Sequence, residues 1–245
     1  MIPISGLLFD KDGTLLDFAR TWPAAYRAAA ADLAARAKTS TAAQAPALAE
    51  TLLRRAGYDA EGRLEPGSPL AAGSNAEIAA IWAAEPALAA VGDVLAAIER
   101  VFARFAATAP ATVPELADLF ARLNRRGLTL GVATNDSAAA TAAWLDRVGV
   151  AAHLDFVCGA DSGHGAKPGP GMVRAFCAAT GLAPAAVAVI GDTAHDLDMA
   201  RAAGAGLAVA VLGGVGDREQ LAPRADRVIA SVAEVEAALA DHLRD

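Results

Sequence analysis

The sequence predicts an α/β fold, a doubly wound parallel sheet with an all-helical segment inserted after its first strand. Short apolar runs alternate with helix-length segments from about residue 113 to the end of the chain. Strands and helices that alternate in this way form a parallel sheet that helices cover on both faces. Before residue 113 the pattern differs, since residues 21–57 and 76–108 are rich in alanine and contain no convincing strand. A core with a helical insert is therefore expected.

The N-terminal part supplies the first strand and the insert. Residues 4–10 form an apolar run that ends at Asp10 and is expected to be a buried strand. Long connections without secondary structure are uncommon in compact domains. We therefore predict a helical domain at 17–110 and assign 1–16 and 111–245 to the core. Within the insert, residues 62–75 are rich in Gly, Pro and Ser and are expected to form an irregular loop.

The remainder of the chain supplies the other strands and their covering helices. Pro114 near a first helical position and Gly127 as a stop predict a helix over 113–126. A capping box, Ser231 to Glu234, predicts the start of the last helix. The other expected elements are strands at 128–134, 153–159, 186–192, 206–212 and 225–231, and helices at 137–148, about 170–180 and about 195–203.

Composition and charge argue against several classes of protein. The formal net charge of −7 disfavours non-specific binding of nucleic acid, which needs a basic surface. No apolar run is long enough to cross a bilayer, and the N-terminus lacks a signal-peptide pattern. We therefore expect a cytoplasmic protein with no membrane partner. Cys158 and Cys177 are expected to be inert packing residues in a reducing compartment.

Polar side chains follow four of the predicted strands. Asp10 and Asp12 follow the first strand, and Thr134 with Asn135, Lys167, and Gly191 with Asp192 follow three others. In open parallel sheets ligands bind outside the carboxyl ends of the strands, so the fold is expected to bring these residues together. In an extended strand, Asp10 and Asp12 project to one side, where each raises the pKa of the other. A cation, a shared proton or a reaction that needs both groups makes such a pair tolerable.

With these motifs in this order, the chain resembles the haloacid dehalogenase (HAD) superfamily, in particular its phosphatases with a helical cap. The four motifs of the family stand here as Asp10-Lys11-Asp12-Gly13-Thr14, Thr134, Lys167-Pro168, and Gly191-Asp192-Thr193-Ala194-His195-Asp196. The resemblance covers the whole chain. It implies a Rossmann-like core and a cap of the C1 type at 17–110, and the overall appearance is similar to phosphoglycolate phosphatases.

The resemblance implies a phosphatase that cleaves a small phosphomonoester through an aspartyl-phosphate. Asp10 would attack phosphorus. The Asp12 side chain would protonate the leaving alcohol and then deprotonate the attacking water. Thr134, Asn135 and Lys167 would bind the phosphoryl oxygens and stabilise their charge in the transition state.

The resemblance also implies Mg²⁺ as the cofactor. Asp10, the backbone carbonyl of Asp12, and Asp192 would hold the ion, which prefers oxygen ligands and keeps several waters. Asp196 would hold a metal-bound water from one helical turn beyond Asp192. The expected partner is a small phosphorylated molecule, and the expected state is a monomer or a homodimer.

Residues that select the substrate are expected in the cap, which carries none of the four motifs. The loop 62–75 offers Arg63, Ser68, Ser74 and Asn75 as polar candidates. Arg63 is the leading candidate for a carboxylate or second anionic group, because a guanidinium binds one bidentately. A solvent-facing arginine is the competing interpretation.

Two residues depart from the pattern of the family. Lys11 stands between the two aspartates, where an apolar residue is common, and strand alternation turns it away from Asp10. Phe18 lies at the expected hinge of the cap, where many relatives carry a small hydroxyl residue. Phe18 therefore bears on the substrate rather than on the class of reaction.

Other functions compete with a phosphatase. A phosphomutase of the same superfamily would keep both aspartates, whereas a haloacid dehalogenase would leave Asp12 and Asp192 idle. A silent binding module would not need the motifs intact. A calcium loop is disfavoured because Gly13 comes fourth rather than sixth. Histidine chemistry at His164 or His195 is disfavoured because the carboxylates already suffice.

Overall fold

The core of the protein is one parallel sheet. A computed structural model of the chain describes residues 3–37 and 43–242. Within these residues, six strands lie in the order β3-β2-β1-β4-β5-β6, and every neighbouring pair is parallel. The strands are β1 (Gly6–Phe9), β2 (Thr129–Ala133), β3 (Phe156–Cys158), β4 (Val187–Gly191), β5 (Leu207–Val211) and β6 (Arg227–Ile229). The predicted α/β sheet is confirmed.

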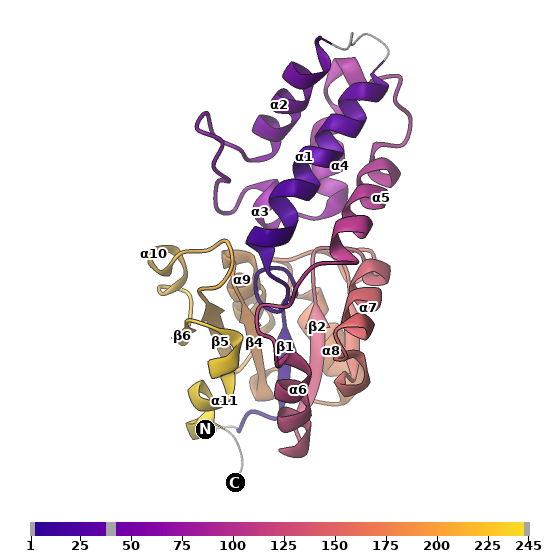
Figure 1. Cartoon of the computed structure of the whole chain (residues 1–245). Helices are drawn as coiled ribbons and strands as arrows, with labels where there is room; N and C mark the ends of the chain where they lie inside the picture. The colour runs from indigo at the N-terminus through magenta and orange to yellow at the C-terminus, as the bar shows by residue number, and fades with distance from the viewer. Residues whose placement is uncertain (1–2, 38–42, 243–245) are drawn as a thin grey trace.

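Helices form two groups, which Figure 1 shows one above the other. The upper group follows β1 and consists of α1 (Phe18–Arg36), α2 (Ala45–Ala56), α3 (Pro69–Ala72), α4 (Asn75–Ala83) and α5 (Val94–Ala106). The lower group is α6 (Leu116–Arg125), α7 (Ala138–Arg147), α8 (Gly171–Thr180), α9 (Ala194–Ala203), α10 (Arg218–Leu221) and α11 (Val235–Ala238). No named strand lies in the described part of 17–110, so the upper group stands over the sheet as a helical layer.

Alternation along the strands buries both faces of the sheet. Leu7 and Phe9 of β1 belong to a core that includes α6, α7 and α11, whereas Leu8 between them packs with α8 and α9. A strand whose successive side chains all find apolar neighbours reads as a continuous hydrophobic run. Cys158 and Cys177 are buried without a disulfide, and burial raises the pKa of the Cys158 thiol to about 12.

The order of the strands reverses at β1. β1 pairs with β2 on one side and with β4 on the other, so the crossovers on its two sides run in opposite directions. Just beyond the end of β1, the backbone N–H of Asp10 donates to Ile190 O of β4 at 2.8 Å. Ligands of open α/β sheets bind at such a reversal, and the residues that follow β1 and β4 lie there.

The chain enters and leaves the upper helices side by side. Leu16 and Ala111 form an antiparallel bridge, the N–H of Asp17 donates to Pro110 O at 3.0 Å, and the N–H of Thr112 donates to Leu15 O at 2.8 Å. Asp17 also caps α1, because its carboxylate accepts from Arg20 N at 3.1 Å. The two connections therefore form a short paired ribbon between the two groups of helices.

Several predicted elements differ from the structure. The expected loop 62–75 contains α3, which begins at Pro69, and a proline at a first helical position favours a helical turn. Within the helix-prone segment 21–57, α1 and α2 are separate helices, and 38–42 lies outside the described residues. The helix α10 was not predicted.

The predicted capping box near the C-terminus does not form. Ser231 Oγ accepts from Ala233 N, and Glu234 Oε2 accepts from Ala230 N rather than from Ser231 N. A 3₁₀ turn over Val232–Glu234 therefore precedes the short helix α11.

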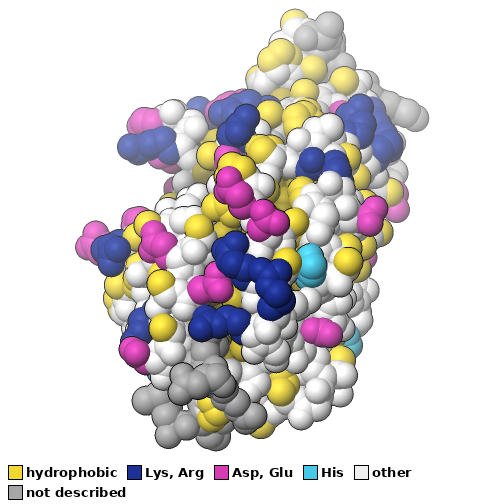
Figure 2. Space-filling model, turned by 60° about the horizontal axis from the view of Figure 1, so that its bottom comes forward, with side chains coloured by type: hydrophobic (Ala, Val, Ile, Leu, Met, Phe, Trp, Pro, Cys, Tyr) yellow, Lys and Arg dark blue, Asp and Glu magenta, His cyan; other side chains and the backbone are white. Residues whose placement is uncertain are grey.

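At the surface drawn in Figure 2, basic and acidic side chains lie interspersed rather than in one continuous basic band.

Candidate active site

Residues from the four motifs converge beneath the upper helices. A cleft with about 500 Å³ of empty space, part of it open to solvent, lies between the carboxyl ends of the strands and the helical layer. Its floor includes Asp10, Asp12, Thr134, Lys167 and Asp196. These residues follow different strands or begin α9, so the fold brings together positions that are up to 186 residues apart, as between Asp10 and Asp196.

The loop after β1 is shaped by a glycine. Gly13 has φ +94°, a conformation that favours glycine, and its N–H donates to Leu16 O at 2.8 Å. A Cβ at this position would lie 2.2 Å from Asp192 Oδ2. The loop therefore turns sharply and packs against the residue that follows β4.

Lys167 is held between two carboxylates. Its Nζ lies 2.5 Å from Asp10 Oδ1 and 2.6 Å from Asp196 Oδ1, and all three side chains are buried. Burial lowers the pKa of the Lys167 ammonium, but Asp10 and Asp196 outweigh this effect and raise it above its ordinary value. Asp196 Oδ2 accepts from both the N–H and the hydroxyl of Thr193, at 3.0 and 2.7 Å. Both oxygens of Asp196 are thus engaged within the protein.

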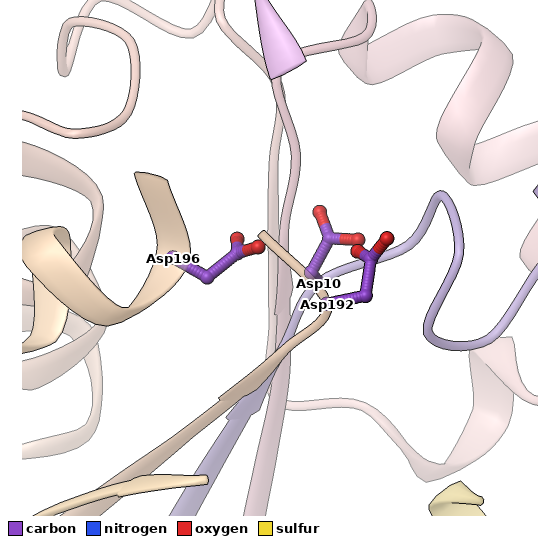
Figure 3. A group of neighbouring side chains, drawn as sticks. All are labelled: Asp10, Asp192 and Asp196. Carbon is purple, nitrogen blue, oxygen red and sulfur yellow. The ribbon is translucent and has the colours of Figure 1, made fainter. Parts of the chain in front are cut away.

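Asp10 and Asp192 each keep one carboxylate oxygen without a partner. Among the described residues, Asp10 Oδ2 and Asp192 Oδ1 are buried and have no hydrogen-bond partner, while Asp192 Oδ2 accepts from Val215 N at 2.8 Å. In Figure 3 these two carboxylates lie next to each other, and Asp196 points toward them from α9. Ligand atoms of the three aspartates lie within 4.8 Å of one another. Unpartnered buried carboxylate oxygens fit a cation that prefers oxygen ligands.

Burial also shifts the protonation of this cluster. It raises the pKa of Asp10 to about 7, although Lys167 acts in the opposite direction; Asp196 and Asp12 add to the rise. The pKa of Asp192 is raised well above its usual range, first by burial and then by Asp10 and Asp196. Burial and the repulsion between these carboxylates therefore disfavour their charged forms, and a bound cation would counter that effect.

Asp12 faces the cleft and accepts hydrogen bonds from a residue of the upper helices and from a residue that follows β2. Its Oδ1 accepts from Trp22 Nε1 of α1 at 2.8 Å, and its Oδ2 accepts from the Thr134 hydroxyl at 3.2 Å. Lys11 Nζ lies 3.3 Å from Oδ2. Burial raises the pKa of Asp12, although Lys11 lowers it. The carboxyl of Asp12 is therefore oriented toward the cleft, with a pKa above its ordinary value.

The sequence did not indicate the partner of Lys11. Its side chain is fully buried, and its Nζ lies 2.5 Å from Asp136 Oδ2. Asp136 Oδ1 in turn accepts from Asn75 Nδ2 at 3.0 Å and from Ser137 N at 2.7 Å. A buried lysine needs an acidic partner, and Asp136, two residues after Thr134, was an acid close to the motifs that had no assigned role.

Asn135 supports the floor of the cleft rather than offering a free amide. Its Nδ2 donates to Ala72 O at 2.8 Å and to Lys167 O at 3.3 Å, and its Oδ1 accepts from Lys167 N at 2.9 Å. The side chain therefore fixes the backbone of Lys167 and of α3. The two histidines considered from the sequence contact other groups: His195 Nδ1 is 3.1 Å from Ala72 O, and His164 lies by the ring of Phe156.

The structure corrects the expectation for Arg63. This side chain is 74% exposed, pairs with Asp59 at 2.7 Å and Glu61 at 3.3 Å, and does not line the cleft. The Asp59 and Glu61 carboxylates pair with the guanidinium at the exposed surface, where such pairs contribute little to stability. Arg63 is therefore not placed to bind a substrate carboxylate.

The other polar candidates of the loop are divided. Ser74 caps α4 by accepting from Glu77 N, and Ser68 does not line the cleft. Asn75 alone of these candidates lines it, and its amide donates to Asp136. Phe18, which the sequence connected with the substrate, lines the upper wall of the cleft. Trp22, Tyr26 and Phe102 line it as well and were not predicted, because helix-prone sequence does not reveal which face turns to the sheet.

Comparisons with known proteins identify a family. The family model described as a hydrolase, haloacid dehalogenase-like hydrolase, matches residues 4–204.

No helix in the described ranges has both the length and the apolar character that a bilayer span requires.

Relatives in sequence match only part of their length. The protein named "Probable phosphatase IndB" of Dickeya dadantii (strain 3937) is 36% identical over 116 residues, which are 47% of this chain and 50% of that protein. The phosphoglycolate phosphatase of Escherichia coli (strain K12) is 32% identical over 91 residues, which are 37% of this chain and 36% of that protein. The matched stretches therefore span half or less of these relatives.

The fold matches over the full length. A crystal structure of a HAD phosphatase from Thermococcus onnurineus superposes with a TM-score of 0.70 at 18% identity, and covers 98% of this chain and 100% of that one. At this identity the likeness concerns the fold alone.

Proposed function

The chain belongs to the haloacid dehalogenase-like hydrolases, and we propose that it is a Mg²⁺-dependent phosphatase acting on a small phosphomonoester. The observation that carries the proposal is the unpartnered Oδ2 of Asp10, buried at the floor of the cleft beside Lys167. Oδ1 of the same carboxylate is held by the lysine, so one oxygen is anchored and the other is available. The names of the curated relatives add support for a phosphatase.

Asp10 is the proposed nucleophile. Its Oδ2 would form a bond to phosphorus while the bond from phosphorus to the leaving oxygen breaks, which leaves an aspartyl-phosphate and an alkoxide. Asp12 would give its proton to that alkoxide. Burial favours the protonated form of Asp12, and its hydrogen bonds to Trp22 and Thr134 fix its direction.

The second half of the reaction would reverse the role of Asp12. Now ionised, Asp12 would take a proton from water as the water oxygen attacks phosphorus. The bond between phosphorus and Asp10 then breaks, which releases phosphate and restores both carboxyls. Lys167, with its ammonium against Asp10, would lie beside the phosphoryl oxygens and offset their charge. The Thr134 hydroxyl would be the uncharged donor to the phosphoryl oxygens. Asn135 would support this binding site by holding the backbone of Lys167.

The aspartate cluster fits the expected metal. Asp192 would hold Mg²⁺ through its unpartnered Oδ1, together with the Asp10 oxygen that does not attack phosphorus and the backbone carbonyl of Asp12. A bound Mg²⁺ would neutralise charge between an attacking carboxylate and a phosphate. Asp196 is proposed to act from outside that set, since Lys167 and Thr193 already engage its oxygens. Its role toward a metal-bound water stays a prediction.

Other parts of the proposal concern the chain as a whole. We divide it into a cap at 17–110 and a core at 1–16 and 111–245, and the paired connections near Leu16 and Ala111 support that division. A cytoplasmic location and a monomeric or homodimeric state stay predictions of the sequence. Phosphoglycolate is the substrate that the relatives suggest.

The test is turnover with and without metal. Purified protein with Mg²⁺ should release phosphate from p-nitrophenyl phosphate and from a panel of small phosphomonoesters, in solvent enriched in ¹⁸O. EDTA should abolish the activity, and Mg²⁺ should restore it, whereas Ca²⁺ should substitute poorly because its shell is larger and looser. Phosphate that carries one solvent oxygen supports hydrolysis. A phosphorylated sugar formed without solvent oxygen would identify a phosphomutase instead, and full activity after exhaustive chelation would contradict the metal requirement.

A further inference from the structure

The upper wall of the cleft is aromatic. Aromatic residues make up only 5% of the chain, yet Phe18, Trp22, Tyr26 and Phe102 all line this one cleft. The rings of Trp22 and Tyr26 stack with centroids 5.7 Å apart, and Phe102 meets both edge-on at 5.3 and 5.5 Å. Leu70 and Ile78 also line the cleft, from α3 and α4. These side chains stand over the floor that carries Asp10 and Asp12.

The polar atoms of this wall are already used within the protein. Trp22 Nε1 donates to Asp12 at 2.8 Å, and the Tyr26 hydroxyl donates to Leu70 O at 2.5 Å. Asn75 Nδ2 donates to Asp136 at 3.0 Å. A ligand that enters from above therefore meets carbon atoms of rings and aliphatic side chains rather than free hydrogen-bond donors, since these donors are engaged within the protein.

Charge in the cleft is unfavourable for an acidic leaving group. Four carboxylates line it, those of Asp10, Asp12, Asp136 and Asp196, and the cation among the described lining residues is Lys167. The ammonium of Lys167 already contacts Asp10 and Asp196. No described arginine lines the cleft, and Arg63 points to solvent. A substrate carboxylate would lose its hydration there without gaining a cationic partner, since Lys167 is already paired.

We propose that this cleft selects phosphomonoesters of uncharged alcohols with an apolar or aromatic body, and disfavours those that carry a carboxylate, such as phosphoglycolate. The inference rests on the proposed function, in which the phosphoryl group binds at Asp10 and Lys167. With that group on the floor, the leaving alcohol points upward, where aromatic faces bury apolar area at low entropic cost.

Isosteric substrates test the proposal. Isobutyl phosphate and phosphoglycolate have the same number of non-hydrogen atoms and both release a primary alcohol, but an isopropyl group replaces the carboxylate. With Mg²⁺, kcat/KM for isobutyl phosphate should exceed that for phosphoglycolate at least about tenfold, and 2-phenylethyl phosphate should exceed both. Equal values, or a preference for phosphoglycolate, would overturn the inference while leaving the phosphatase proposal intact.

A matched pair of variants locates the selectivity. Phe102→Leu should lower kcat/KM for 2-phenylethyl phosphate by about fivefold or more and change that for phosphoglycolate less than about twofold. Phe105→Leu is the control, because Phe105 lies on the same helix, α5, and does not line the cleft. It should leave the ratio of the two substrates unchanged. An equal loss for both substrates in Phe102→Leu would show that the wall does not contact the leaving group.

Binding separates this inference from the proposed function. Isopentylphosphonate and 3-phosphonopropanoate mimic the same two substrates and cannot be hydrolysed. Calorimetry on the full chain with Mg²⁺ should give a dissociation constant at least about tenfold lower for the isopentyl compound. If no ester is turned over, the phosphatase proposal fails, and this order of affinities still decides the inference. Equal affinities, a reversed order or no binding of either compound would overturn it.

Discussion

Lys11 Nζ lies 2.5 Å from Asp136 Oδ2 and joins the loop after β1 to the loop after β2. The lysine side chain is fully buried, and that of Asp136 is 5% exposed. Asp12 Oδ2 lies 3.3 Å from the same ammonium, so one cation serves two carboxylates. Removal of either member of a buried pair leaves a charge without compensation.

Lys11→Met should therefore destabilise the protein. The side chains have similar length, but Asp136 and Asp12 would face each other without the ammonium, and we expect the free energy of unfolding to fall by about 3–5 kcal/mol. Urea denaturation measures it. The double variant Lys11→Met/Asp136→Asn should recover part of the loss, which a double-mutant cycle quantifies. A single variant within about 1 kcal/mol of wild type would show that the pair has little energetic role.

Asp10→Asn should abolish turnover and preserve the fold. An amide oxygen is too weak a nucleophile to attack phosphorus, but it can still accept from Lys167. Phosphate release and far-ultraviolet circular dichroism measure the two effects. Mass spectrometry must exclude deamidation back to aspartate. More than a few per cent of wild-type activity in intact variant would remove Asp10 as the nucleophile.

The same variant should change how stability depends on pH in the metal-free protein. The pKa of Asp10 is raised from 3.8 to about 7 in the folded state, so between these values the folded chain holds a proton that the unfolded chain has lost. Stability from this group is then present at low pH and is lost as the pH rises through the window. In EDTA, wild type should lose Tm relative to Asp10→Asn as the pH rises from about 4 to about 7. A constant difference would contradict the raised pKa.

Trp22→Phe should lower kcat more than it changes the affinity for an apolar substrate. The ring remains in the wall, but the N–H that binds Asp12 Oδ1 at 2.8 Å is lost. Loss of that orientation is expected to lower kcat about tenfold, which corresponds to about 1.4 kcal/mol. Steady-state kinetics with 2-phenylethyl phosphate separates kcat from KM. The opposite pattern, a raised KM with kcat unchanged, would show that the N–H does not position Asp12.

Arg63→Ala should leave activity unchanged. The side chain is 74% exposed and does not line the cleft. We expect kcat/KM for phosphoglycolate and for p-nitrophenyl phosphate to stay within about twofold of wild type, because exposed ion pairs contribute little. A selective loss on phosphoglycolate would return Arg63 to the site through a rearrangement of its loop.

Local signals predicted most of the sheet and of its cleft floor. Apolar runs such as that before Asp10 form buried strands of the sheet in an α/β fold, and parallel strands bring their carboxyl ends to one edge. Asp10, Thr134 and Lys167 therefore lie together in the structure. Asp192 follows β4 at the same edge, as its position after the apolar run 186–192 predicted.

The upper wall could not be predicted in the same way. Trp22 lies on α1 and Phe102 on α5, and their contact depends on how two helices separated by 57 residues pack. Alanine-rich sequence specifies helices without specifying which side faces the sheet. The position of Arg63 outside the cleft could not be predicted for a related reason, since a place in the loop 62–75 does not give the direction of a side chain. Lys11 required a partner, but only the folded chain shows that it is Asp136.

The paired ribbon at Leu16 and Ala111 makes the upper helices an exchangeable module. Because the polypeptide departs and returns at adjacent points, a different insert of any length can be joined there without altering the path of β1 or of α6. Recombination or protein engineering can thus replace the wall that meets the alcohol and retain the aspartates and the lysine beneath it. A foreign insert between residues 17 and 110 would change the surface that faces the alcohol, and it would need a donor in the place of Trp22 Nε1 to keep Asp12 oriented.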